Sequence, residues 1–458
     1  MKRFFTFITA FALGLPLFGQ ALGQAELQEI RSSFVKDEAT AALQNVISHT
    51  LDLSKLAITV NPDKVLDGLF KYEVKALPSA PDQYTSGRCW LFTSLNALRP
   101  WAMEKYNVKD FRFSHNFDSF WDLFEKSNLF LEGIIETRAE ETDSRIVAHL
   151  FKTPVADGAA WNFFINLAEK YGVAPESVMP ETVHSNKTAN MRTLLNQKLR
   201  REGWEIRKKA AAGASEADLR AHKLVVMKDV YRILALCLGE PPTEFTWSYK
   251  DRSGKVHKLT TTPQAFYKSI VPAGYGFDSE VMIMNDPTRP YYKVYEIDRY
   301  RNTAEGRNWV YLNLPNEEMK AGALATLKDG QAVYVSCDWR KGMVKPANSM
   351  TCDAYDYDSL FGVEFGMDKE ARIATRYSAS AHAMLIIACD TDENDRPTQW
   401  KFFNSWFDTG EKATLTFTDE WFDGYIFRMA LNKKYLSDKA LQALKTAPVK
   451  LPAWDYMN

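Results

Sequence analysis

The sequence has little cysteine, almost no net charge and no late apolar run long enough to cross a membrane. Its 57 lysine and arginine residues are balanced by 58 aspartate and glutamate residues, for a net charge of −1, so no overall field favours nucleic acid or anionic lipid. Beyond residue 15, charged or polar residues interrupt every apolar run, which excludes a transmembrane helix. With 46% hydrophobic and 25% charged residues, the composition is that of a globular protein.

The 5 cysteines do not have the spacing of zinc ligands or of a CxxC redox pair. Because their number is odd, at least one thiol lacks an intrachain partner. Cys237, Cys337 and Cys389 end or follow apolar stretches and are interpreted as core residues, whereas Cys352 lies in a polar loop. Pairing of Cys337 with Cys352 in an oxidising compartment is an alternative that the sequence leaves open.

The N-terminus has the pattern of a secretory signal peptide. Lys2 and Arg3 form a basic start, about a dozen mostly apolar residues follow, and the small Ala21 and Gly23 stand where a signal peptidase reads. We therefore predict a signal peptide over residues 1–23 and an exported, soluble mature protein, periplasmic or secreted. An amphipathic or buried first helix is the structural alternative.

Helical apolar spacing dominates the first part of the chain, and strand patterns dominate the rest. Helices are predicted from this spacing over residues 89–98, 116–126, 161–170 and 190–238. The last is broken at the small residues 210–215, and Pro100 should end or kink the first. A β-hairpin is predicted over 246–259, and strands follow from about Gly276. Helices before strands indicate the α+β class.

Cys89 differs from the other cysteines because a helical pattern begins at it, with Gly87 before it and Trp90 after it. A thiol at a helix N-terminus faces unpaired backbone N–H groups and the positive end of the helix dipole, which favours the nucleophilic thiolate. The same N–H groups can hold a developing oxyanion. Cys89 is therefore the candidate nucleophile, and it needs a base.

His382 is the candidate base because it directly precedes an apolar strand, where its ring would be held rigidly. Asn404 on the next strand can accept the imidazole N–H, and Trp406 can shield that bond from water. The remaining histidines stand in charged or loop settings and are interpreted as surface or capping residues: His49, His115, His149, His184, His222 and His257.

The order of these motifs resembles that of papain-type cysteine peptidases. The matching segments are Gln83, Gly87-Arg88-Cys89-Trp90, His382-Ala383-Met384 and Asn404-Ser405-Trp406. More narrowly, the chain resembles the bleomycin hydrolase or aminopeptidase C family. The segments that carry this narrower resemblance include Asn96-Ala97-Leu98-Arg99, Asp157-Gly158, Glu169-Lys170-Tyr171-Gly172-Val173, Asp419-Glu420-Trp421-Phe422, Lys434-Tyr435-Leu436-Ser437 and Leu451-Pro452-Ala453-Trp454-Asp455.

The resemblance implies a two-lobed papain-like fold, with the catalytic cysteine helix in a helical lobe and the histidine and asparagine in a β lobe. It implies one peptidase domain over residues 24–458, with a helical and hairpin insertion at about 185–275 and a C-terminal tail at about 448–458. Cys89 and His382 lie roughly 290 residues apart, against about 130–150 in papain relatives, and the surplus fits such insertions.

By resemblance, Cys89 is the nucleophile, His382 the base and then acid, and Asn404 the residue that orients His382. Gln83 and the Cys89 backbone N–H form the oxyanion hole. The implied activity is that of a cysteine-type aminopeptidase, which hydrolyses N-terminal residues of peptides through an acyl-thioester. Family members are homohexamers whose C-terminal carboxylate meets the substrate's free amine. A reduced thiol is required, and no metal or organic cofactor is implied.

The chain departs from the family pattern at several points. It ends at Asn458, earlier than in bacterial relatives, so an exported peptidase with dipeptidyl or endopeptidase specificity is an alternative. Phe407 stands where glycine is usual, and Ala159-Ala160 replaces a Gly-Gln type of pair. Family members are usually cytoplasmic, which is the alternative to export.

Two further alternatives concern the class of the protein. An inactive assembly or binding protein on the same fold would not be expected to keep Gln83, Cys89, His382 and Asn404 together. The basic stretch over residues 198–209 is interleaved with glutamates and is interpreted as a solvated helix face. We therefore expect peptide substrates and no nucleic acid partner.

Overall fold

The computed structural model describes residues 21–49, 52–59, 66–75, 77–339, 341–344, 349–406 and 413–457. The chain forms two units, Met1–Ile58 and Thr59–Asn458. In the first unit the described residues form three helices, α1 (Gln24–Ser33), α2 (Glu38–His49) and α3 (Leu53–Leu56). Residues 1–20, which hold most of the predicted signal peptide, lie outside the described residues.

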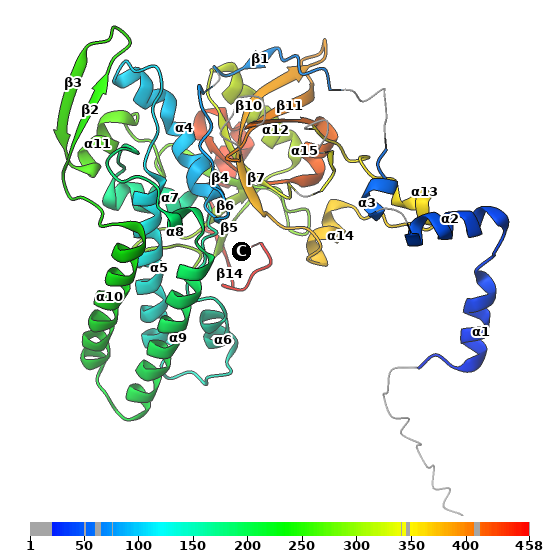
Figure 1. Ribbon diagram of the computed structural model, residues 1–458, viewed down its shortest axis with the longest axis horizontal. Helices are drawn as coiled ribbons and strands as arrows, with labels where there is room; N and C mark the ends of the chain where they lie inside the picture. Colours follow the sequence, from blue (N-terminus) through cyan, green and yellow to red (C-terminus); the bar gives the residue numbers. More distant parts are fainter. Residues whose placement is uncertain are drawn as a thin grey trace, which may run out of the picture. The chain divides into compact units, whose positions relative to one another are not determined.

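The first half of the second unit is mainly helical (Figure 1). Its helices are α4 (Cys89–Lys105), α5 (His115–Glu136), α6 (Arg145–Lys152), α7 (Trp161–Tyr171), α8 (Val183–Asn186), α9 (Ala189–Ala211), α10 (Glu216–Leu238) and α11 (Pro263–Ile270). The predicted break at 210–215 separates α9 from α10, whose first turn is capped by Ser215. The helix α7 ends where it was predicted to, at Gly172, which has φ +77° and no room for a Cβ beside Pro263.

The helix α4 begins at Cys89 as predicted, but it does not end at Pro100. It continues to Lys105, because Leu98 and Ala102 on either side of the proline stay fully packed in the core. An exposed proline that loses one backbone hydrogen bond is tolerated when the buried face of the helix is continuous on both sides of it.

The predicted hairpin is present as β2 (Phe245–Lys250) and β3 (Val256–Thr261), joined at the turn by Gly254 with φ +87°. A twelve-stranded sheet fills the second half of the unit. Along the sheet the strands lie in the order β14 (Val449–Leu451), β5 (Lys293–Ile297), β6 (Val310–Asn313), β4 (Glu280–Met284), β13 (Ile426–Asn432), β7 (Val333–Cys337), β10 (His382–Thr391), β11 (Pro397–Phe403), β12 (Thr414–Thr418), β9 (Ser349–Met350) and β8 (Met343–Val344), and β1 (Tyr72–Glu73) pairs with β10.

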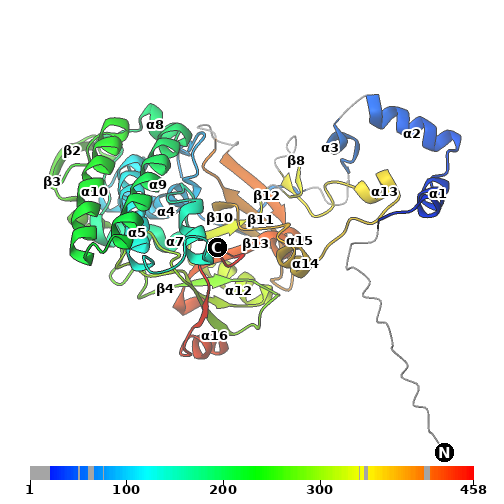
Figure 2. The ribbon, with the colours of Figure 1, turned by 90° about the horizontal axis from the view of Figure 1, so that it is seen from below.

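The helix α4 packs against the central strands β7 and β10, which places the start of the helix next to the start of β10 (Figures 1 and 2). One apolar core lies between the helices and the sheet. A second core lies under α12 (Asn316–Lys328), α15 (Asp419–Tyr425) and α16 (Asp438–Ala443). Two short helices, α13 (Tyr357–Phe361) and α14 (Lys369–Ala374), precede β10 in the chain. None of the helices in the described ranges has the length and apolarity needed to span a bilayer.

Candidate active site

Gln83 is held in one orientation by its neighbours in the loop before α4 and by the strand end at Ser405. Its Nε2 donates to the Ser86 carbonyl oxygen at 2.7 Å, and its Oε1 accepts from the Ser405 hydroxyl at 2.6 Å. The Ser86 hydroxyl donates to the Gln83 carbonyl oxygen at 2.6 Å. Since an amide NH₂ carries two hydrogens, one N–H of Gln83 remains for a ligand in the cavity beside it.

Asp157 holds the Gly87 backbone before Cys89 and the Trp90 side chain after it. Its carboxylate accepts from the Gly87 N–H at 3.3 Å, and its backbone carbonyl accepts from the Trp90 indole N–H at 2.8 Å. The same carboxylate oxygen accepts from the Thr188 hydroxyl at 2.5 Å. A Cβ at position 87 would lie 2.7 Å from the Asp157 Cβ, so glycine is required there for this close approach.

His382 and Asn404 are joined by a hydrogen bond of 2.8 Å between the ring Nε2 and the amide Oδ1. Because Oδ1 can only accept, Nε2 carries the proton, and Nδ1 is the acceptor nitrogen of the ring. The Trp406 indole stacks on the ring with centroids 4.2 Å apart, and Trp339 lies edge-on at 5.9 Å. His382 is 3% exposed, so the bond to Asn404 is shielded from water.

Burial sets the resting charge of the cysteine and the histidine. It raises the pKa of the Cys89 thiol, although backbone N–H groups of Ala383, Trp90 and Cys89 act in the opposite direction. It lowers the pKa of His382 to about 4, against the opposing effect of the Asn404 hydrogen bond. The expected stabilisation of the thiolate by the helix start is therefore outweighed by desolvation, and both groups are neutral at pH 7.

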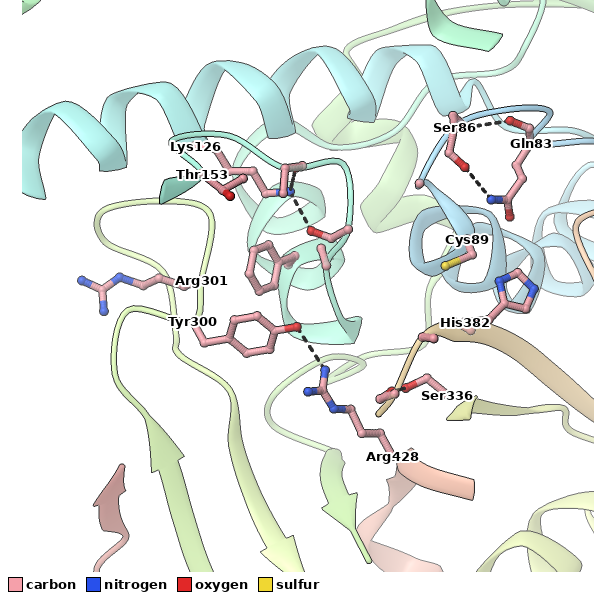
Figure 3. A pocket seen from close by; sticks show the side chains of 18 of the residues that line it. Gln83, Ser86, Cys89, Lys126, Thr153, Tyr300, Arg301, Ser336, His382 and Arg428 are labelled. Atoms are coloured by element: carbon pink, nitrogen blue, oxygen red, sulfur yellow. Dashed lines mark hydrogen bonds between the residues drawn. The ribbon is translucent and has the colours of Figure 1, made fainter. Parts of the chain in front are cut away.

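The cysteine and the histidine line one cavity of about 750 Å³. Figure 3 shows Gln83, Cys89 and His382 at one end of this cavity and Lys126, Tyr300 and Arg301 at the other. Its lining includes four cations, Lys126, Arg299, Arg301 and Arg428, and among the described residues that line it none is aspartate or glutamate. Asn404 stands behind His382, outside the lining.

Several residues of this cavity could not be predicted from the sequence. Tyr300, Arg428 and Trp339 come from distant strands and loops, and no local pattern marks them. His149, interpreted from the sequence as a surface or capping residue, is half-buried and also lines the cavity. His115 is likewise not at the surface: it is 3% exposed and stacks on Phe92 at 3.6 Å.

None of the five cysteines is joined in a disulfide in the described chain, including Cys337 and Cys352. Cys337 and Cys389 are buried as expected, whereas Cys237 is only partly buried. Ala159 lines the cavity, and Phe407 and Asn458 lie outside the described residues.

Comparison with known proteins relates this chain to peptidases. The Peptidase C1-like family model matches residues 21–458. The chain is 35% identical to mouse (Mus musculus) bleomycin hydrolase over 387 residues, covering 82% of this chain and 85% of that protein. It is 34% identical to aminopeptidase C of Lactobacillus delbrueckii subsp. lactis over 439 residues, covering 94% and 97%.

The fold agrees with the sequence comparison. The crystal structure of PepW from Lactobacillus rhamnosis HN001 superposes with a TM-score of 0.89 at 34% identity, covering 95% of this chain and 98% of that one. The mixed helix and sheet content is therefore that of a papain-like cysteine peptidase fold. The chain belongs to the Peptidase C1-like family and is a cysteine peptidase.

Proposed function

We propose that this protein is a cysteine-type aminopeptidase, which removes N-terminal residues from peptides through an acyl-thioester intermediate. The observation that carries the proposal is the placement of Cys89 and of the Asn404-bonded His382 on one cavity. The names of the aminopeptidase C and bleomycin hydrolase relatives support the same reading.

In the first half of the reaction, His382 Nδ1 takes the proton of the Cys89 thiol, and the sulfur attacks the carbonyl carbon of the peptide bond. The electron pair of the carbonyl moves to its oxygen, where the free N–H of Gln83 and the backbone N–H of Cys89 can stabilise it. Asn404 stabilises the imidazolium through its Oδ1. Collapse of the intermediate breaks the C–N bond, and His382 gives its proton to the leaving amine.

In the second half, His382 takes a proton from water, and the resulting hydroxide attacks the thioester carbon. The C–S bond breaks, the N-terminal residue leaves as a free acid, and the sulfur regains its proton from His382. Neutral thiol and neutral imidazole are the correct starting states for this cycle, because the base must be unprotonated to accept the thiol proton.

The restriction to N-terminal residues requires recognition of the substrate's ammonium group. The described lining of the cavity offers cations and no carboxylate side chain, so we propose that the anion comes from the chain's own C-terminus. A dipeptidyl or endopeptidase specificity follows if that end does not reach the cavity.

We further propose that the helical and sheet parts are the two lobes of a papain-like domain over residues 24–458. In this view residues 185–275 are an insertion, 448–458 the tail, and 1–23 a signal peptide for export, and the enzyme assembles as a homohexamer. Mass spectrometry of the mature N-terminal peptide tests the signal peptide, and light scattering of the purified enzyme tests the homohexamer.

The function is tested with matched fluorogenic substrates in reducing buffer, one with a free amine and one N-acetylated. An aminopeptidase hydrolyses the free amine far faster, and an epoxysuccinyl inhibitor labels Cys89, as mass spectrometry of the modified peptide would show. A Cys89→Ser variant is the control, and it should lose both the hydrolysis and the labelling. Equal rates on the two substrates would exclude the exopeptidase assignment, and intact substrates in both cases would exclude a peptidase.

A further inference from the structure

Arg428 is a buried cation with no carboxylate partner among the described residues. It lies on β13 and is 4% exposed. Its guanidinium donates to the Tyr300 hydroxyl at 3.1 Å and to the backbone carbonyl oxygen of Met457, and it lies 5.1 Å from the centre of the Trp309 ring. Burying a charge without a carboxylate partner costs free energy, so we expect the groups that Arg428 binds to have a functional role.

Two of the three other cations of the cavity differ from Arg428 in having a carboxylate partner, and the third, Arg301, donates to the Asn308 side-chain oxygen at 2.8 Å. Lys126 is paired with Asp122 at 2.6 Å, and Arg299 with Glu136 at 2.8 Å. Arg428 instead uses its donors on a neutral hydroxyl and on a main-chain carbonyl close to the end of the chain. Its partner is therefore the C-terminal segment, which runs from the start of β14 at Val449 to Met457.

The C-terminal segment is held firmly up to that carbonyl. The strand β14 pairs with β5, and Asp455 forms an ion pair with Arg289 at 2.5 Å. The Arg289 guanidinium also lies 4.5 Å from the centre of the Tyr456 ring. Met457 is 2% exposed, and its N–H donates to the Asp455 carboxylate at 3.0 Å.

The same guanidinium lines the catalytic cavity together with Cys89 and His382. Figure 3 shows Arg428 reaching up to the Tyr300 hydroxyl, on the side of the cavity away from Gln83. In the sequence only Asn458 follows Met457. Arg428 thus connects the last described carbonyl of the chain with the wall of the cavity.

We propose that Arg428, oriented by Tyr300, is a positioning residue that latches the C-terminal segment at the catalytic cavity. The latched segment limits how many residues of a peptide can lie on the N-terminal side of the bond that is cleaved. The consequence for specificity rests on the proposed aminopeptidase function, whereas the latch itself does not. A planar guanidinium can serve the Tyr300 hydroxyl and the Met457 carbonyl at fixed angles, and an ammonium group cannot reproduce this fork.

The latch is tested first without any peptidase assay. In Arg428→Gln, carboxypeptidase should remove residues from the C-terminus at least about tenfold faster than in the wild type, followed by mass spectrometry. Arg299→Gln is the matched control: it removes a charge from the same cavity whose ion pair is with Glu136 on α5, and its rate should stay near that of the wild type. An unchanged rate in folded Arg428→Gln would overturn the proposal.

The second measurement is the ratio of kcat/KM on the free-amine substrate to kcat/KM on its N-acetylated counterpart. In Arg428→Gln and Arg428→Lys this ratio should fall by about tenfold or more, chiefly through faster cleavage of the N-acetylated substrate. A truncated chain that ends at Trp454 should show the same lowered ratio as the Arg428 variants. Adding Arg428→Gln to this truncated chain should not lower the ratio further, because the substitution and the truncation both act through the C-terminal segment.

Tyr300→Phe decides the question if the Arg428 variants do not fold, since it removes only one hydroxyl. It should lower the ratio in the same direction by a smaller factor. If carboxypeptidase shows that the segment is released but the ratio of the two kcat/KM values is unchanged, the latch has no role in specificity. A wild-type ratio near one contradicts the proposed aminopeptidase function instead, and the carboxypeptidase measurement then still reports on the latch.

Discussion

The carboxylate of Asp157 accepts a hydrogen bond from the backbone N–H of Gly87, two residues before Cys89. The same oxygen is bound by the Thr188 hydroxyl and paired with Arg192 at 3.2 Å, both near the start of α9. The loop that leads into Cys89 is thereby tied to a helix that lies about a hundred residues further along the chain. The geometry of the nucleophile depends on this connection.

A methyl group at position 87 should disrupt the loop. In Gly87→Ala the new Cβ would lie 2.7 Å from the Asp157 Cβ, so the loop or Asp157 must move. Because small displacements of a nucleophile are costly, we expect kcat/KM to fall by about 100-fold. Gly366→Ala is the control, since a Cβ there has nothing within 4 Å. Full activity in Gly87→Ala would contradict the close approach.

The activity should depend on the protonation of His382. Burial lowers the pKa of His382 to about 4, so kcat/KM should rise as the pH increases through this region and the ring becomes a base. The hydrogen bond that His382 donates to Asn404 Oδ1 raises this pKa, and Asn404→Ala should therefore move the acid limb to lower pH. We also expect the plateau to fall by about tenfold, because the imidazolium loses its acceptor.

The pH profiles of the wild type and Asn404→Ala are the measurement, with Asn394→Ala in an exposed turn as the control. An acid limb near pH 6.5, the ordinary value for histidine, would show that burial does not govern His382.

Cys89 should react slowly with alkylating agents when its base is missing. Burial raises the pKa of the thiol, so at pH 7 the thiolate forms only by proton transfer to His382. In His382→Ala the rate of Cys89 carbamidomethylation at pH 7 should fall by about 100-fold. His257→Ala, which affects a hairpin histidine paired with Asp251, should leave the rate unchanged. An undiminished rate in His382→Ala would mean that the helix start alone supplies the thiolate.

Asp118 should make the fold less stable as the pH rises. It is fully buried on α5, and neither carboxylate oxygen has a hydrogen-bond partner. Burial, helped by the charge of Asp122, raises its pKa well above the ordinary value. The protonated form is the one that suits the fold, so its contribution is complete below about pH 4 and is lost as the pH rises through the raised pKa.

Asp118→Asn removes this dependence. We expect its Tm at pH 8 to exceed that of the wild type by about 2–4 °C, with a smaller difference at pH 5. Asp229→Asn, an exposed position on α10, should change neither value. A parallel pH dependence of Tm in Asp118→Asn and the wild type would contradict the buried titration.

The sequence by itself determined the class of the protein, because short-range patterns carry that information. The helix that begins at Cys89, the strand that begins at His382 and the turn around Gly254 all follow from the periodicity and the turn residues of a few neighbours. The family motifs around them indicate a cysteine peptidase, which the comparisons show.

Only the tertiary structure decided which distant residues share the cavity and how they are charged. Nothing near Tyr300, Arg428 or His149 in the sequence marks them, since they meet Cys89 only when the helices pack on the sheet. Burial by the same packing raises the pKa of Cys89 and lowers that of His382, and for the thiol it outweighs the effect of the helix start. Local pattern therefore predicts the elements and the nucleophile, whereas burial, which depends on every packed neighbour, sets the resting state of the site.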